Sequence, residues 1–156
     1  NYFEKELGIK VFKKPEAFVF NSKSFFIGHG DGLGPGDKGY KRMKFILSNP
    51  LFIWMFKLIH PDIGISLGKY FSQKNKLISG EKDLSFKGEE NEWLIRYCKT
   101  KLDKEHIDYF IFGHRHLPIT HSLKNKSKYI NLGDWISHYT FGVFDGKNFN
   151  LRTFNP

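Results

Sequence analysis

The sequence is poor in cysteine and proline and contains no long hydrophobic run. Its 156 residues include six prolines and a single cysteine, Cys98. One cysteine excludes an intrachain disulfide and a zinc site built on thiolates, and it favours a reducing compartment. No apolar stretch reaches the roughly 18 to 20 residues that a membrane-spanning helix needs, and no signal peptide is recognisable. These absences predict a protein of the cytosolic side that does not cross a bilayer.

Aromatic residues and positive charge are abundant instead. Aromatics make up 17% of the chain, which excludes a disordered polyelectrolyte and predicts a folded core. The 25 Lys and Arg residues against 16 Asp and Glu give a net charge of +9. Such a charge favours anionic partners, namely nucleic acid, phosphorylated metabolites or an anionic lipid surface. The charge by itself does not distinguish among the three.

Strand-like and helix-like segments alternate along the chain, which is typical of an α/β fold. Residues 2–7 predict a short helix that ends at Gly8, and residues 9–12 a short strand. The β-rich runs 17–20 and 25–28, separated by a polar tetrapeptide, predict a hairpin. Further along, the pattern predicts a polar loop at 74–87, a helix opening at Gly88 with acidic residues in its first turn, and strands at 107–112, 129–132, 139–144 and 149–154.

Residues 40–76 differ in character and predict a helical insertion. Pro50 and Pro61 should divide it into three short helices, because proline interrupts helical hydrogen bonding. The middle segment, residues 51–59, is apolar nearly all round. Such a helix is either buried in a core or exposes a hydrophobic surface, and its sequence leaves both open.

Three of the seven histidines follow predicted strands beside glycine. His29 lies in Gly-His-Gly-Asp-Gly, and His114 and His116 lie in Gly-His-Arg-His. Imidazole is the commonest metal ligand in proteins, and ligands one residue apart in extended chain project to the same side. Glycines at these positions allow a metal with bound phosphate to approach the backbone. The pattern favours one shared metal centre over histidines that merely cap loops.

These motifs resemble the C-terminal half of the calcineurin-like metallophosphoesterases. The order of a hairpin, HGDG, a helical apolar insertion, EENEWLIRYC, IDYFIFGHRH and YINLGDW is most similar to the UDP-2,3-diacylglucosamine diphosphatase family of lipid A biosynthesis. The resemblance covers nearly all of residues 1–156. It implies a four-layer α/β/β/α sandwich, of which this chain would form the C-terminal part, with the insertion at about 40–76 as a helical cap.

The resemblance also implies a dinuclear metal site and its chemistry. His29 and His114 would bind one divalent cation and His116 the other, with Mn²⁺ the expected metal. Two such cations would activate water to split the pyrophosphate of UDP-2,3-diacylglucosamine into UMP and 2,3-diacylglucosamine 1-phosphate. Arg115 would be a catalytic residue that neutralises charge on the phosphoryl group, unless it points outward into solvent.

The predicted cap would receive the acyl chains of this lipid-linked UDP-sugar. Its apolar lining would be Leu51, Trp54, Met55 and Leu58, with Lys69 as a further substrate-binding residue. Basic residues around it could meet anionic headgroups, so that the protein would sit peripherally on the inner face of the cell membrane. The basic residues are Lys41, Arg42, Lys44, Lys57 and Lys69.

The sequence departs from the family pattern in one large respect. No DxH, GD or GNHD-type motif, which would supply bridging carboxylate and amide ligands, precedes the HGDG segment. The chain therefore resembles a member that begins after these motifs, with the N-terminal half of the fold missing. We expect such a chain by itself to bind Mn²⁺ weakly and to hydrolyse substrate poorly, because metal affinity depends on the number and support of ligands.

Two other functions remain open at this stage. A calcineurin-like phosphoesterase for a soluble phosphodiester or nucleotide would share the metals but would have no use for an apolar cap. A nucleic-acid-binding module would suit the positive charge. However, the aromatics do not alternate with Lys and Arg on one face and no RNP-type motif is present, so nucleic acid is not the expected partner.

Overall fold

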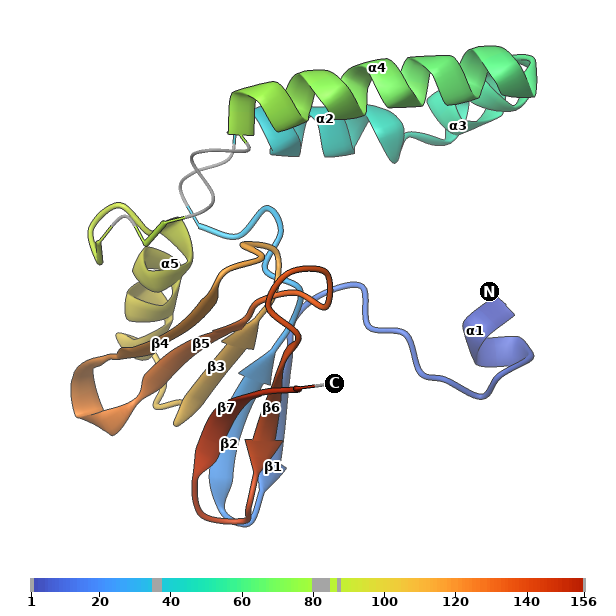
Figure 1. Cartoon of the computed structure of the whole chain (residues 1–156). Coiled ribbons are helices and arrows are strands. Elements are labelled where there is room, and N and C mark those ends of the chain that lie inside the picture. The colour runs from blue at the N-terminus through green and yellow to red at the C-terminus, as the bar shows by residue number, and fades with distance from the viewer. Residues whose placement is uncertain (1, 35–37, 80–84, 87, 156) are drawn as a thin grey trace.

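A five-stranded mixed sheet forms the centre of the protein (Figure 1). The computed structural model describes residues 2–34, 38–79, 85–86 and 88–155. The strand order is β1-β2-β3-β5-β4. The strands are β1 (Glu16–Phe20), β2 (Lys23–Ile27), β3 (Tyr109–Phe112), β4 (Pro118–Ser122) and β5 (Lys128–Leu132).

The pairing of these strands brings distant segments of the chain together. β1 and β2 form the expected antiparallel hairpin, in which Phe18 pairs with Phe25. β2 then pairs in parallel with β3, with Phe25 opposite Tyr109, and β3 pairs in parallel with β5. Because parallel neighbours end at the same edge of a sheet, the chain leaves β2 and β3 side by side.

Each face of the sheet is covered by one other layer. Helix α5 (Trp93–Leu102) covers one face, and the hairpin of β6 (Thr140–Phe144) and β7 (Phe149–Thr153) covers the other. The α/β prediction is therefore confirmed. The described residues form these three layers, and the four-layer sandwich stays a prediction.

Alternation along the strands divides the core into two clusters. Phe26 and Phe110 point toward α5, whereas Phe25 and Tyr109 point toward β6 and β7, as the period of two in a strand requires. Cys98 lies in α5 fully buried, as expected for a small core residue. Burial strongly raises the pKa of its thiol, so the thiolate is disfavoured.

A second region consists of helices α2 (Lys38–Leu47), α3 (Pro50–Lys57) and α4 (Pro61–Ser79), here called the helical unit. Figure 1 shows it away from the sheet. Both predicted proline breaks are confirmed. At the first, Asn49 caps α3 by accepting a 2.9 Å hydrogen bond from the amide of Leu51. The third helix is not short, however, because α4 continues to Ser79.

Several expected boundaries were wrong. Residues 74–79, predicted as loop, are helical, and residues 9–12 form no strand. β4 was not predicted at all. The helix expected from Gly88 begins only at Trp93, with no acidic residue in its first turn. The remaining helices are α1 (Tyr2–Lys5), which the sequence did predict, and the short 3₁₀ helix η1 (Lys124–Lys126). Among the described helices, none has both the length and the apolar character needed to cross a bilayer.

Candidate functional site

The loops after β2 and β3 stay paired beyond the strands. The amide of Gly28 donates to the carbonyl of Ile111 at 3.1 Å, and the amide of Gly113 donates to the carbonyl of His29 at 3.0 Å. These two bonds continue the parallel ladder to the histidines. The sheet therefore fixes the backbone of both motifs at one edge.

The first two predicted ligands lie next to each other. The rings of His29 and His114 meet edge to face, with centroids 5.3 Å apart and planes at 85°. A third ring, that of Trp93 at the start of α5, contacts His114 with centroids 5.7 Å apart. His114 is thus held between an aromatic side chain of α5 and the histidine of the neighbouring strand.

His116 has a different neighbour. Its side chain is 65% exposed, and its Nδ1 lies 3.8 Å from Oδ2 of Asp134. The same carboxylate oxygen lies 3.3 Å from Nδ1 of His138. Backbone amides of Ser137, Ile136 and His138 donate to Asp134 and hold its pKa well below the usual range. Asp134 therefore stays ionised beside His116, a role that the sequence did not reveal.

Arg115 is buried between the two histidines of its motif. Only 4% of its side chain is exposed, and Nη2 donates to Oε1 of Glu92 at 2.9 Å and to the carbonyl of Ser85 at 3.0 Å. The alternative of an outward, solvated arginine is therefore wrong. The predicted contact of Arg115 with a phosphoryl group stays a prediction.

Two of the three glycines that flank the histidines are required by the protein's own backbone and packing. A Cβ at Gly28 would lie 2.7 Å from Pro15, and Gly30 has a φ of +101° with Leu94 close by. A Cβ at Gly113 would make only an ordinary contact, 3.5 Å from Nδ1 of His29. Crowding of Gly28 and the left-handed backbone of Gly30 explain two of the glycines without a ligand.

A cavity of about 780 Å³ opens beside His29. Both apolar and lysine side chains line this cavity, a combination that the sequence did not predict because the residues come from distant segments. Lys44 of α2 is one of the lining residues and forms a 2.5 Å ion pair with Asp31, which lines the cavity too. The other lining residues include Phe12, Lys13, Lys14, Phe18, Phe26 and Tyr97.

The predicted substrate residues of the helical unit lie on its surface. Exposed fractions are 61% for Leu51, 59% for Trp54, 49% for Met55 and 69% for Leu58, and Lys69 is exposed too. No residue of α3, all of which the structure describes, is buried. The alternative of a buried core helix is therefore wrong. Their role in acyl-chain binding stays a prediction.

The two neighbouring imidazoles fit a metal, but only as part of a ligand set. Metal–nitrogen bonds of about 2.1 Å would place the ring centroids of two ligating histidines roughly 5 Å apart, close to the observed separation. Among the described residues, no three His, Cys, Asp or Glu side chains gather around one point where a metal could be held. The described residues therefore offer a pair of imidazoles that would need further ligands to complete a metal site.

Comparison with known proteins agrees with the resemblance of the motifs. No family model matches the sequence. A protein named UDP-2,3-diacylglucosamine hydrolase from Porphyromonas gingivalis is 31% identical over 98% of this chain and 63% of its own length. Proteins of the same name from Shewanella sp. and Pseudomonas fluorescens are 26% and 25% identical, over 85% and 98% of this chain.

The similarity extends along nearly the whole chain, and it confirms the resemblance read from the motifs. The chain spans less than two thirds of each of these relatives, namely 63%, 54% and 61% of their lengths.

Proposed function

We propose that this chain, a homologue of the proteins named UDP-2,3-diacylglucosamine hydrolase, is part of a metal-dependent enzyme that hydrolyses the pyrophosphate of UDP-2,3-diacylglucosamine. The products would be UMP and 2,3-diacylglucosamine 1-phosphate. The observation that supports the proposal most directly is the contact of His29 with His114, 5.3 Å apart at the ends of neighbouring parallel strands.

His29 and His114 would hold one divalent cation and His116 a second, with Mn²⁺ as the proposed metal. Such cations supply Lewis-acid polarisation of a phosphoryl oxygen and a water of lowered pKa. The ionised Asp134 faces Nδ1 of His116 and would orient that ring with its other nitrogen free to bind, as carboxylates commonly do for metal-bound histidines. Ligands from outside this chain, from the N-terminal half of the fold, would complete the set.

The helical unit would bind the acyl chains of the substrate. Trp54 and Met55 on α3 and Leu58 directly after it expose apolar side chains, and Lys57 and Lys69 lie close to them in the sequence. An apolar surface with lysines around it suits both acyl chains and an anionic lipid surface. We infer peripheral binding to the inner, cytoplasmic face of the cell membrane.

Release of UMP from UDP-2,3-diacylglucosamine by the intact protein that contains this sequence tests the proposal. His114→Ala should lower turnover at least about a hundredfold, because it removes a proposed ligand. His106→Ala is the matched control, since this histidine is 53% exposed and precedes β3, at the opposite end of that strand from His114. This variant should keep the turnover of the wild type.

Undiminished turnover of His114→Ala would refute the ligand role. Hydrolysis of soluble phosphodiesters or nucleotides in preference to the lipid-linked substrate would instead support the phosphoesterase alternative. Binding to an oligonucleotide in preference to vesicles would support the nucleic-acid-binding alternative.

A further inference from the structure

The turn that carries His114 and His116 has an unfavourable backbone. Their φ angles are +67° and +54°, in the left-handed region that side chains other than glycine rarely adopt. Between them, the amide of Arg115 donates to the carbonyl of Gly113 at 2.8 Å. Two left-handed histidines in three residues persist only where the surroundings hold them.

The side chain of Arg115 connects this turn to two other segments. Its Nη2 reaches Oε1 of Glu92 at 2.9 Å and the carbonyl of Ser85 at 3.0 Å. Glu92 is 1% exposed and Arg115 4% exposed. Where water is excluded a charge-assisted bond is strong, and loss of either residue leaves the other charge buried without its ion-pair partner.

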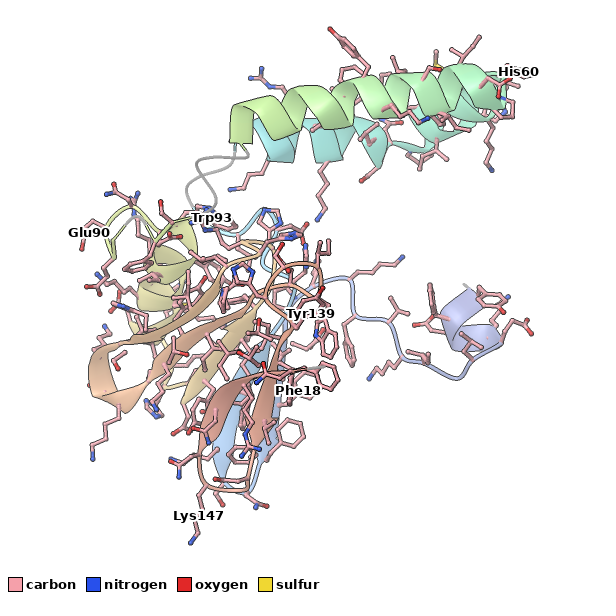
Figure 2. The ribbon with its side chains drawn as sticks, in the orientation of Figure 1. Phe18, His60, Glu90, Trp93, Tyr139 and Lys147 are labelled. Carbon is pink, nitrogen blue, oxygen red and sulfur yellow. The ribbon has the colours of Figure 1, made fainter. Side chains whose placement is uncertain are left out.

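Glu92 also lies at the start of α5. It is the residue before Trp93, the first residue of the helix, and the ring of Trp93 contacts His114. Figure 2 shows Trp93 at the end of α5 that lies toward the helical unit. The start of α5 thus holds the turn twice, through the Glu92–Arg115 ion pair and through the ring of Trp93.

We propose that Glu92 and Arg115 are positioning residues, whose buried ion pair holds the left-handed turn so that His114 faces His29. This inference deepens the proposed function, on which it rests, because it names the pair that orients the proposed ligands. Neither residue touches the substrate in this role. The ion pair would act before any metal binds, so its effect is measurable in the metal-free protein.

The experiment measures the nuclear Overhauser effect between the ring protons of His29 and His114 in the metal-free intact protein with labelled histidine. The wild type should show this contact. Arg115→Gln and Glu92→Gln should each lose it while contacts within the core, such as Phe26 with Phe110, persist. Glutamine keeps much of the volume of either side chain and removes the charge.

Asp108→Asn is the matched control. Asp108 forms a partly buried ion pair with Lys23 at 2.9 Å, at the opposite end of β2 and β3 from the histidines. This variant should lose stability but keep the contact between His29 and His114.

Persistence of the contact in either charge-removing variant that folds would overturn the proposal. Its loss in Asp108→Asn would also overturn it, because general loosening would then explain the effect. If Arg115→Gln does not fold, the result for Glu92→Gln tests the proposal. If neither variant folds, the ion pair serves global stability and the proposal is refuted. A wild type that shows the contact but releases no UMP would refute the proposed function alone.

Discussion

Helices α3 and α5 show opposite relations between composition and burial. α3 is apolar at seven of its eight positions, PLFIWMFK, yet none of its residues is buried. α5, WLIRYCKTKL, is half polar, yet Leu94, Ile95, Cys98 and Leu102 are buried. The difference teaches that burial requires an extensive partner surface, which the sheet gives to α5, whereas α3 stays exposed at all eight positions although Phe56 lies against Gly64 of α4.

The largest expected effect is a difference between the two helices in how much a core-sized side chain contributes to the stability of the protein. Leu94→Ala in α5 should lower the free energy of unfolding by about 3–5 kcal/mol, because it opens a cavity in the core. Leu51→Ala in α3 should change it by less than about 0.5 kcal/mol, because its side chain is exposed. Urea unfolding measures both. Equal losses would show that α3 is packed and would break the comparison.

The second expected effect concerns what α3 contacts instead. A Trp54→Ser and Leu58→Ser double variant should bind anionic vesicles at least about a hundredfold more weakly, since each side chain contributes roughly 1.5–3 kcal/mol when buried and tenfold equals about 1.4 kcal/mol. Vesicle co-sedimentation measures this. Val19→Ser and Phe20→Ser, at exposed positions of edge strand β1, form the control. An equal loss in the control would mean that any exposed apolar residue contributes to vesicle binding.

The third expected effect is a pH dependence of the free energy of unfolding. It arises in the sheet and not in α3, which has no carboxylate. Burial by itself would raise the pKa of Asp108, but the amide and hydroxyl of Ser24 and the ammonium of Lys23 outweigh it and lower the pKa to about 2. Because the folded pKa lies below the ordinary 3.8, this carboxylate stabilises the fold above that pH. The contribution, about 2 kcal/mol, should be lost as the pH falls from about 4 to 2.

Unfolding free energies across this pH range test the assignment. Asp108→Asn should be less stable at neutral pH and should lose less on acidification than the wild type. Asp62→Asn, at an exposed carboxylate of α4, should follow the wild type. If stability falls with pH in Asp108→Asn as steeply as in the wild type, the acid sensitivity arises from another group.

The smallest expected effect sharpens the view of α3 as a lipid-binding surface. Lys57→Gln should weaken binding to anionic vesicles about fivefold, since a lysine near such a surface contributes about 1 kcal/mol. Lys147→Gln, at the far end of the protein from the helical unit (Figure 2), should leave binding unchanged. Equal effects of the two would indicate attraction by net charge alone.

Local patterns predicted the parts of the fold that depend on neighbouring residues. The hairpin of β1 and β2 and the breaks before Pro50 and Pro61 follow from turn chemistry and proline geometry. β4 was not predicted because only Ile119 of its five residues is buried and because Pro118 argues against a strand. Residues 9–12 have a strand-like pattern but pair with no strand in the described part of the chain, which a local pattern does not reveal.

The sequence predicted only part of the candidate site, for the same reason. Two motifs that each follow a strand with glycine and histidine predicted the meeting of His29 with His114. The pair of Glu92 with Arg115 was missed because Glu92 resembled the first turn of a helix that in fact starts at Trp93. Its burial depends on packing between segments 23 residues apart, which the spacing of residues does not show.

The pairing of β2 with β3 joins residues 84 positions apart, as in the bond from Ser24 to Asp108. The entropy lost in closing so long a loop grows only with the logarithm of its length, by about 0.6 kcal/mol for each doubling. Whole helical turns can therefore be added to or removed from the helical unit at little thermodynamic cost, while the register of β2 and β3 keeps His29 beside His114. The same separation should slow folding, because folding rates fall as contacts become less local.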